Sequence, residues 1–71
     1  MLATYYEKNI GNQYYVSADR HEEFDVDECS VSVIDLDNGF FIEEIECEFY
    51  KLFHTFCIVL EKYQKLYYGL D

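Results

Sequence analysis

The last third of the chain carries the pattern that most restricts the fold. When residues 48–68 are placed on a helix of 3.6 residues per turn, most of the large apolar side chains fall on one side. These residues are Phe49, Leu52, Phe53, Phe56, Val59, Leu60, Tyr63, Leu66 and Tyr67, and the opposite side holds Lys51, His54, Glu61, Lys62 and Lys65. Gly69 follows as a C-cap. The pattern predicts one long amphipathic helix that buries a single face.

The residues before this helix have the composition of strands. Aromatic and β-branched runs flank a Gly/Asn turn at residues 9–12, and two further runs flank the turn at residues 37–39, Asp-Asn-Gly. Asn-Gly favours a two-residue type I′ turn, which needs positive φ at both central residues. We predict strands at about residues 3–8, 13–18, 30–36 and 40–46, and a helix at about residues 48–68.

These elements predict an α+β fold with one domain over residues 1–71. A small antiparallel sheet of three to four strands, formed by two hairpins, packs against the C-terminal helix. The segment FFIEEIE, residues 40–46, leaves an alternative, because it does not alternate cleanly and its apolar residues also fit the helix. On that alternative the helix begins near Phe41. We favour the hairpin because the Asn-Gly turn follows a clear strand pattern.

Charge is distributed very unevenly along the chain. The formal net charge is −10, while 51% hydrophobic and 20% aromatic residues predict a folded domain and not a disordered acidic tail. Residues 19–48 hold 12 acidic residues against Arg20 alone, which gives 1 − 12 = −11 for this block. Direct binding of nucleic acid is not expected, because phosphate contacts need a basic surface. A domain with so much like charge gains from salt or from a cationic partner.

No segment carries a complete catalytic or cofactor motif. Residues 35–46 partly match the pattern of a calcium-binding EF-hand loop. However, Gly39 is at the fifth position, where the loop needs glycine at the sixth, and a strand pattern precedes the segment. His21 beside Glu22 and Glu23 is interpreted as a solvated neighbour of carboxylates and not as a general acid or base. We expect no enzymatic activity, no cofactor and no metal.

The cysteines and the apolar runs indicate where the protein acts. Three cysteines, Cys29, Cys47 and Cys57, cannot all pair within one chain and are interpreted as buried thiols of a reducing compartment. With His54 they could supply four zinc ligands, but the closely spaced cysteine pairs of structural zinc sites are absent. The first ten residues do not read as a signal peptide, and the longest apolar run is far too short to span a membrane. We expect a cytoplasmic protein.

The acidic residues are the strongest candidate for a binding surface. In a strand, residues i and i+2 share a face about 6.6 Å apart, so carboxylates at that spacing form rows that resemble the charges of a phosphate backbone. Aromatic residues within or beside the block, such as Phe24, Phe40 and Phe41, are typical interface anchors. The predicted contact residues are Glu22, Glu23, Asp25, Asp27, Glu28, Asp35, Asp37, Glu43, Glu44 and Glu46.

In small size, acidity and aromatic content the chain resembles the DNA-mimic inhibitors that phages use against restriction, CRISPR or repair nucleases. The resemblance rests on residues 19–48. It implies a non-enzymatic inhibitor of a basic nuclease or other DNA- or RNA-binding protein, and it assigns no functional residues. Alternatives are a homo-oligomer, such as a homodimer, whose acidic block only provides solubility, a nuclease immunity protein, and a metal-binding module.

Overall fold

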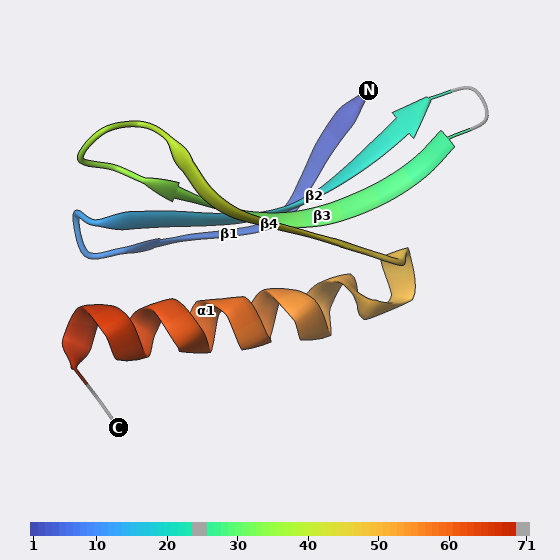
Figure 1. Cartoon of the computed structure of the whole chain (residues 1–71). Coiled ribbons are helices and arrows are strands. Elements are labelled where there is room, and N and C mark those ends of the chain that lie inside the picture. Colours follow the sequence, from blue (N-terminus) through green and yellow to red (C-terminus); the bar gives the residue numbers. More distant parts are fainter. Residues whose placement is uncertain (24–25, 70–71) are drawn as a thin grey trace.

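The computed structural model describes residues 1–23 and 26–69, which form four strands, a short 3-10 helix and one long α-helix (Figure 1). The strands are β1 (Leu2–Ile10), β2 (Tyr14–Glu23), β3 (Val26–Asp35) and β4 (Phe41–Cys47), and the 3-10 helix η1 (Phe49–Lys51) leads directly into α1 (Leu52–Tyr68). Neighbouring strands are all antiparallel, in the order β1-β2-β3-β4. The predicted α+β fold, a small antiparallel sheet against one C-terminal helix, is confirmed.

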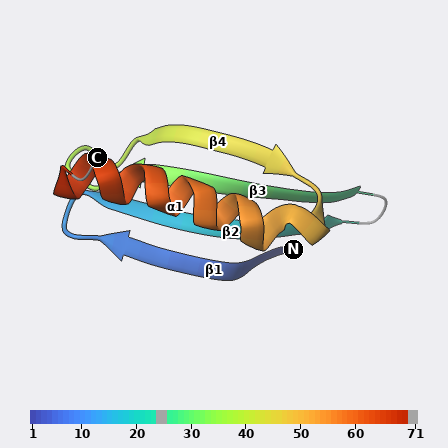
Figure 2. The ribbon, with the colours of Figure 1, turned by 90° about the horizontal axis from the view of Figure 1, so that it is seen from below.

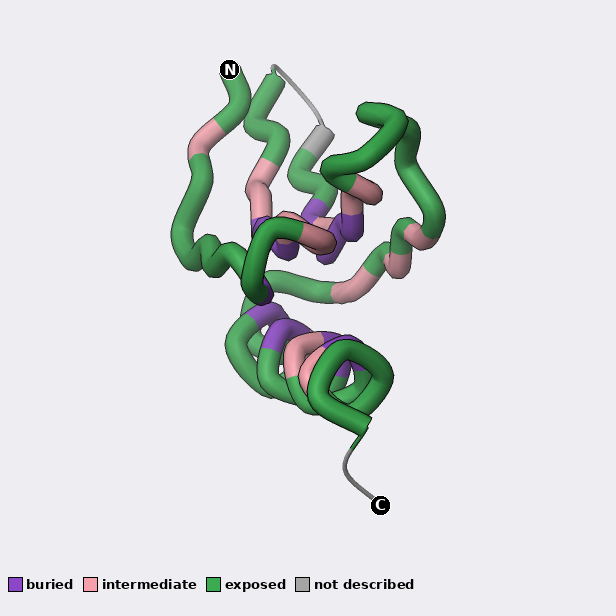
Figure 3. The backbone as a smooth tube through the Cα atoms, turned by 90° about the vertical axis from the view of Figure 1, so that its left-hand side faces the viewer, coloured by how far each residue is buried: buried purple, intermediate pink, exposed green. Residues whose placement is uncertain are grey.

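One face of the sheet is apolar because alternate residues of the two central strands are small or β-branched. Val16 and Ala18 on β2 lie opposite Val33 and Val31 on β3, and all four are fully buried. From the other side, α1 buries Leu52, Phe56, Val59 and Tyr63. Figure 2 shows α1 lying across β2 and β3, with β1 and β4 on either side. Figure 3 shows the buried residues gathered between helix and sheet.

The hairpin between β2 and β3 is longer than the sequence indicated. The predicted strands at 13–18 and 30–36 stop short of the acidic segment, whereas the observed ladder continues through Glu22 and Asp27 to the pair formed by Glu23 and Val26. The sheet therefore contains a third hairpin in addition to the two predicted. Like charges opposite each other disfavour such a ladder. Arg20 compensates this repulsion through contacts that form only in the folded protein.

The turn between β3 and β4 contradicts the predicted two-residue type I′ geometry. Asn38 does not have a positive φ, and only Gly39, at 77°, is left-handed. The Asp35 amide donates to the Phe40 carbonyl at 2.9 Å, so residues 36–39 form a four-residue connection. Within it the Phe40 amide donates to Asn38 Oδ1 at 2.8 Å. The side chain of Asn38 thus satisfies the backbone in place of a left-handed conformation.

β4 is a strand, in agreement with the preferred interpretation, and one irregularity explains its uneven sequence. Glu43 and Phe41 pair with successive residues of β3, so Ile42 is the extra residue of a β-bulge. Because of the bulge, Phe41 lies on the same face of the sheet as Glu44, three residues later. A regular strand would place them on opposite faces.

A second bulge lies in β1, where the register shifts between Thr4 and Tyr6. Over the described residues, the ladder between β2 and β3 runs without such a shift from the Tyr14–Asp35 pair to the Glu23–Val26 pair. Bulges bend a strand and increase its twist. In Figure 1 the N-terminal end of β1, the C-terminal end of β2 and the N-terminal end of β3 bend away from α1.

The helix starts later than predicted, because residues 49–51 form η1. Its C-terminus matches the prediction: Gly69 has a φ of 68° and its amide donates to the Lys65 carbonyl at 2.8 Å. The buried stripe of α1 is narrower than the apolar side of the sequence pattern. Phe53 and Leu66 belong to that side and are 57% and 61% exposed.

Candidate functional site

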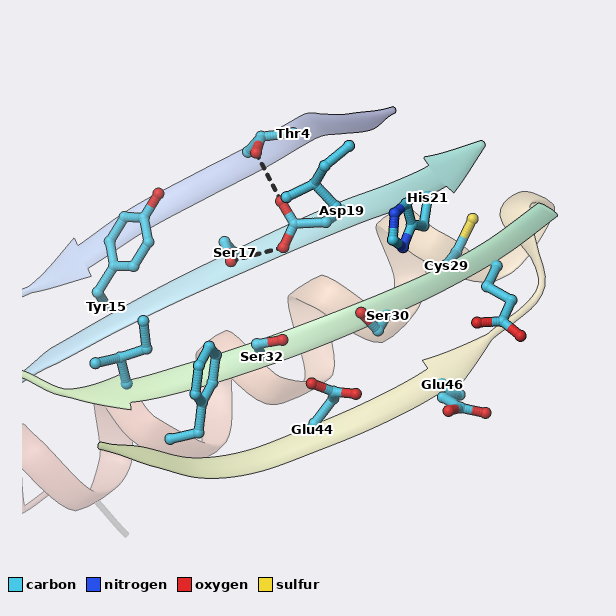
Figure 4. Close-up of a pocket in the computed structure, with 14 residues that line it drawn as sticks. Thr4, Tyr15, Ser17, Asp19, His21, Cys29, Ser30, Ser32, Glu44 and Glu46 are labelled. Atoms are coloured by element: carbon cyan, nitrogen blue, oxygen red, sulfur yellow. Dashed lines mark hydrogen bonds between the residues drawn. The ribbon is translucent and has the colours of Figure 1, made fainter. Parts of the chain in front are cut away.

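The face of the sheet turned away from α1 holds a groove of about 440 Å³, here called the open-face groove. Its lining comes from all four strands, and Figure 4 shows the labelled side chains on this face with α1 behind the sheet. The polar lining residues are Thr4, Tyr15, Ser17, Asp19, His21, Glu28, Ser30, Ser32, Glu44 and Glu46; Leu2, Cys29, Ile34 and Phe41 complete it.

The register of the strands makes this groove acidic. Asp19 on β2 lies opposite Ser30 on β3, which in turn lies opposite Glu46 on β4, and Ser32 lies opposite Glu44. The carboxylates of the lining are Asp19, Glu28, Glu44 and Glu46. No lysine or arginine lines the groove, and none of these four carboxylates forms an ion pair with any residue that the structure describes.

Among the four groove carboxylates, Asp19 is oriented by two side-chain hydrogen bonds. Thr4 Oγ1 donates to its Oδ1 at 2.6 Å, and Ser17 Oγ donates to its Oδ2 at 2.9 Å (Figure 4). Thr4 is its register partner on β1, and Ser17 precedes it on the same face of β2. The two hydroxyls fix the orientation of the carboxylate, and its negative charge is left in place because both donors are neutral.

Aromatic rings stand at both ends of the β2 segment that lines the groove. The Tyr15 hydroxyl donates to the Glu7 carboxylate. This hydrogen bond, followed by burial and the negative charges of Glu7 and Asp19, raises the pKa of Tyr15 to about 12.

At the other end of this β2 segment, His21 Nε2 lies 3.5 Å from Glu23 Oε1, and both side chains are exposed. His21 is thus a solvated neighbour of carboxylates, as interpreted from the sequence.

Part of the predicted acidic surface is neutralised within the chain. Arg20 forms two parallel hydrogen bonds to the carboxylate of Asp27, Nε to Oδ1 and Nη2 to Oδ2, both at 2.8 Å, and its Nε lies 3.1 Å from Glu22 Oε1. The guanidinium carbon also lies 3.9 Å from the centre of the Phe49 ring. The bond to Arg20 lowers the pKa of Asp27. Arg20 thereby holds the acidic end of the β2–β3 hairpin together.

Glu43 faces α1 and not the groove. Lys62 Nζ lies 3.0 Å from its Oε2, and the Tyr63 hydroxyl donates to the same carboxylate. The hydrogen bond from Tyr63, together with Lys62, lowers the pKa of Glu43. Burial, followed by the bond to Glu43, raises the pKa of Tyr63. These contacts join β4 to the helix.

Two other predicted contact residues lie at the turn after β3. Asp35 Oδ1 accepts from Gln13 Nε2 at 3.2 Å and from the Asp37 amide at 2.9 Å, so its side chain organises both neighbouring turns. Asp37 is exposed at the tip. Asp25 lies outside the described residues, as does Phe24. The nine predicted residues that the structure describes are therefore dispersed over the groove, the hairpin end, the turn and the helix side.

Sequence reasoning missed the residues that shape the groove most directly. Asp19 was counted in the acidic block but not among the contact residues, and Ser17 and Ser32 were not considered. The signal was present as the i, i+2 series Tyr15, Ser17, Asp19 and His21. It could be recognised only by extending the strand through the acidic segment.

The four candidate zinc ligands are not brought together. Cys29 is buried and is the register partner of the half-buried Cys47, whereas His54 and Cys57 are exposed on α1. The prediction of buried thiols is therefore wrong for Cys57. Burial is the main reason for the raised pKa of Cys29. Across residues 1–23 and 26–69, no three His, Cys, Asp or Glu side chains are arranged to hold a metal ion.

Within the described part of the chain, no helix is long and apolar enough to cross a membrane. Comparison with protein-family models, curated proteins and solved structures found no match to this chain.

Proposed function

We propose that this protein is a small non-enzymatic inhibitor that binds a basic protein, either a nuclease or another DNA- or RNA-binding protein, as a DNA mimic of the phage anti-defence type. The observation that supports the proposal is the separation of charge in the fold. Arg20 and Lys62 pair with carboxylates at the hairpin end and beside α1, whereas the four carboxylates of the open-face groove have no ion pair among the described residues.

A basic partner would compensate this unpaired charge. Complementary charge speeds association and makes it sensitive to salt, and a protein that normally binds phosphates already presents the required lysines and arginines. The proposed contact surface comprises Glu28, Glu44 and Glu46 of the predicted set, together with Asp19. Glu43 and Asp35 have structural roles instead. The proposed site of action is the cytoplasm of the cell in which the partner acts.

The experiment compares two triple variants with equal charge. Glu28→Lys, Glu44→Lys and Glu46→Lys together change the net charge by +6, from −10 to −4, and all three positions line the groove. The control, Asp37→Lys, Glu48→Lys and Glu61→Lys, makes the same change at exposed positions outside the groove lining. Each protein is used to capture partners from a host lysate at low and high salt.

The proposal expects a DNA- or RNA-binding protein that is captured at low salt, released at high salt and displaced by duplex DNA. The groove variant should lose this partner, and the control should keep it. If both variants lose the partner equally, binding depends on the net charge of the protein and not on the groove. Capture of no partner that nucleic acid displaces would contradict the proposed function.

A second candidate, the homo-oligomer, is favoured by a different observation. Several large apolar side chains are exposed, among them Phe40, Phe41 and Tyr50, at 70%, 64% and 74%. Exposed apolar side chains that gather into a patch often mark an interface. Light scattering over a range of protein concentrations decides this, because a monomer at every concentration contradicts the oligomer.

A further inference from the structure

We infer that the open-face groove is a receptor for arginine side chains that a partner presents on a projecting segment. The inference rests on the proposed function for the basic character of the partner, and it adds the chemical group that is recognised. The site is a groove over the open face of the sheet, lined by residues of all four strands, so it is suited to a group that enters it. Its volume of about 440 Å³ lies within the range of about 300–1,000 Å³ that is usual for ligand sites.

The groove lining is strongly negative. The described lining contains four carboxylates and no lysine or arginine, so it carries a formal charge of −4 apart from His21. Asp19 is oriented by Thr4 and Ser17, whose hydroxyls donate to both of its oxygens. Glu44 and Glu46 stand on the opposite side of the groove, on β4. A cation entering the groove therefore meets carboxylates from both sides.

Ser32 offers the groove a neutral polar group in addition to the carboxylates. Its side chain lines the groove although the residue is only 5% exposed (Figure 4). Its hydroxyl has no hydrogen bond to any residue that the structure describes, in contrast to Ser17, which donates to Asp19. The hydroxyl oxygen therefore keeps free acceptor capacity, and an N–H group entering the groove would donate to Ser32 Oγ.

The aromatic part of the groove lining favours arginine over lysine. Tyr15 and Phe41 line the same groove as the carboxylates. A planar guanidinium stacks on aromatic rings while it donates two parallel hydrogen bonds to a carboxylate, whereas an ammonium group cannot do both. The protein already contains one such arrangement: Arg20 pairs in this way with Asp27 and lies 3.9 Å from the centre of the Phe49 ring. The groove offers the same two kinds of group to an external arginine.

The test measures binding of two peptides of equal length and charge, hexa-arginine and hexa-lysine, by calorimetry at fixed ionic strength. The inference expects hexa-arginine to bind about tenfold more tightly. Glu44→Gln with Glu46→Gln should weaken hexa-arginine at least about tenfold. The matched control, Glu48→Gln with Glu61→Gln, also changes the net charge from −10 to −8 and should change binding less than about twofold. Circular dichroism melts verify that both variants fold.

Ser32→Ala provides a separate arm, because it removes the hydroxyl and leaves the charge of the groove unchanged. It should weaken hexa-arginine about threefold to tenfold, with amide chemical-shift changes on peptide addition centred on residues 17–19 and 30–32. Equal affinities for the two peptides, or equal losses in the groove and control variants, would overturn the inference.

The two proposals can fail separately. A DNA-displaced partner that still binds the Glu44→Gln, Glu46→Gln variant with full affinity would retain the proposed function and remove the arginine receptor. Arginine-selective binding in the groove, with no nucleic-acid-binding protein captured from the lysate, would retain the receptor and remove the proposed function.

Discussion

The two faces of this sheet are made by alternate residues of the same strands and have opposite chemistry. Val31 and Val33 face α1 and are fully buried, while Ser30 and Ser32, beside them in sequence, line an acidic groove. The covered face stabilises the fold through apolar burial. The four groove carboxylates of the open face form no ion pair with any described residue. The difference teaches that a small domain can concentrate charge on one surface when the other is reserved for packing.

The largest expected effect comes from placing a charge on each face in turn. Val31→Asp buries an unpaired carboxylate and should cost at least about 4 kcal/mol, a large part of the roughly 4–11 kcal/mol expected for 71 residues. Ser30→Asp, one residue away on the open face, should cost about 1 kcal/mol or less. Urea denaturation followed by circular dichroism measures both. Similar losses would mean that the two faces do not differ as described.

The next effect is the loss of stability at alkaline pH, to which each face contributes one tyrosine. The pKa of Tyr63, on the helix side, and that of Tyr15, in the groove, are raised above the usual value of 10. The stability linked to a raised pKa is fully present below pH 10 and is lost as the pH rises through the folded values, about 12 for Tyr15. When phenolate absorbance is followed as the pH rises, two tyrosines should therefore ionise at a higher pH than a free tyrosine does. Tyr15→Phe and Tyr63→Phe should each remove one of these two late transitions. A variant that keeps both transitions would contradict the assignment.

A smaller effect separates the two neighbouring glutamates of β4. Glu43→Gln removes the ion pair with Lys62 and weakens the bond from Tyr63, and should cost about 0.5–1 kcal/mol at pH 7. Glu44→Gln removes an unpaired groove charge and should leave stability unchanged or raise it by up to about 0.5 kcal/mol.

The same pair of variants has a pH signature. Because the pKa of Glu43 is lowered from 4.5, its stabilising contribution is present above that value and is lost as the pH falls through the folded pKa. Glu43→Gln should therefore reduce the acid sensitivity of the fold more than Glu44→Gln does. Thermal melts from neutral to acidic pH check the difference, and identical pH profiles for the two variants would contradict it.

The smallest expected effect is the response to salt. Added salt screens the repulsion within the groove and should stabilise the native protein by a few tenths of a kcal/mol. Glu44→Gln with Glu46→Gln should reduce this gain more than Glu48→Gln with Glu61→Gln, which has the same net charge. The measurement is the slope of melting temperature against salt concentration for each double variant. Equal slopes would mean that the repulsion does not come from the groove.

Much of the covered face could be predicted from the sequence, because helix periodicity and turn residues are local signals. The apolar side of residues 48–68 and the Gly69 cap identified α1, and the runs around the two turns identified the sheet. The sequence did not predict how far the β2–β3 hairpin extends. Its acidic end is held by the hydrogen bonds from Arg20 to Asp27, and the Arg20 guanidinium lies against Phe49, which is more than twenty residues later in the chain. Local propensity carries no information about such a contact.

The open face was harder to predict because it is defined by register. Asp19 and Glu46 belong to one site because both are register partners of Ser30. Glu43 faces away from that site because a bulge at Ile42 sets the orientation of β4. Neither relation can be recognised in the charge of a segment. The sequence therefore identified the acidic block correctly but did not distinguish its groove residues from those that bind Arg20 or Lys62.

The bulges have a further consequence, because the two strands that carry them, β1 and β4, are the edges of the sheet. An unpaired edge normally offers its backbone to the strand of another molecule, and stacks of such strands grow into aggregates. An edge interrupted by a bulge offers no continuous run of donors and acceptors, and on β4 a row of glutamates adds repulsion between copies. A sheet uncovered on one face is thus protected from fibrous growth at both of its margins.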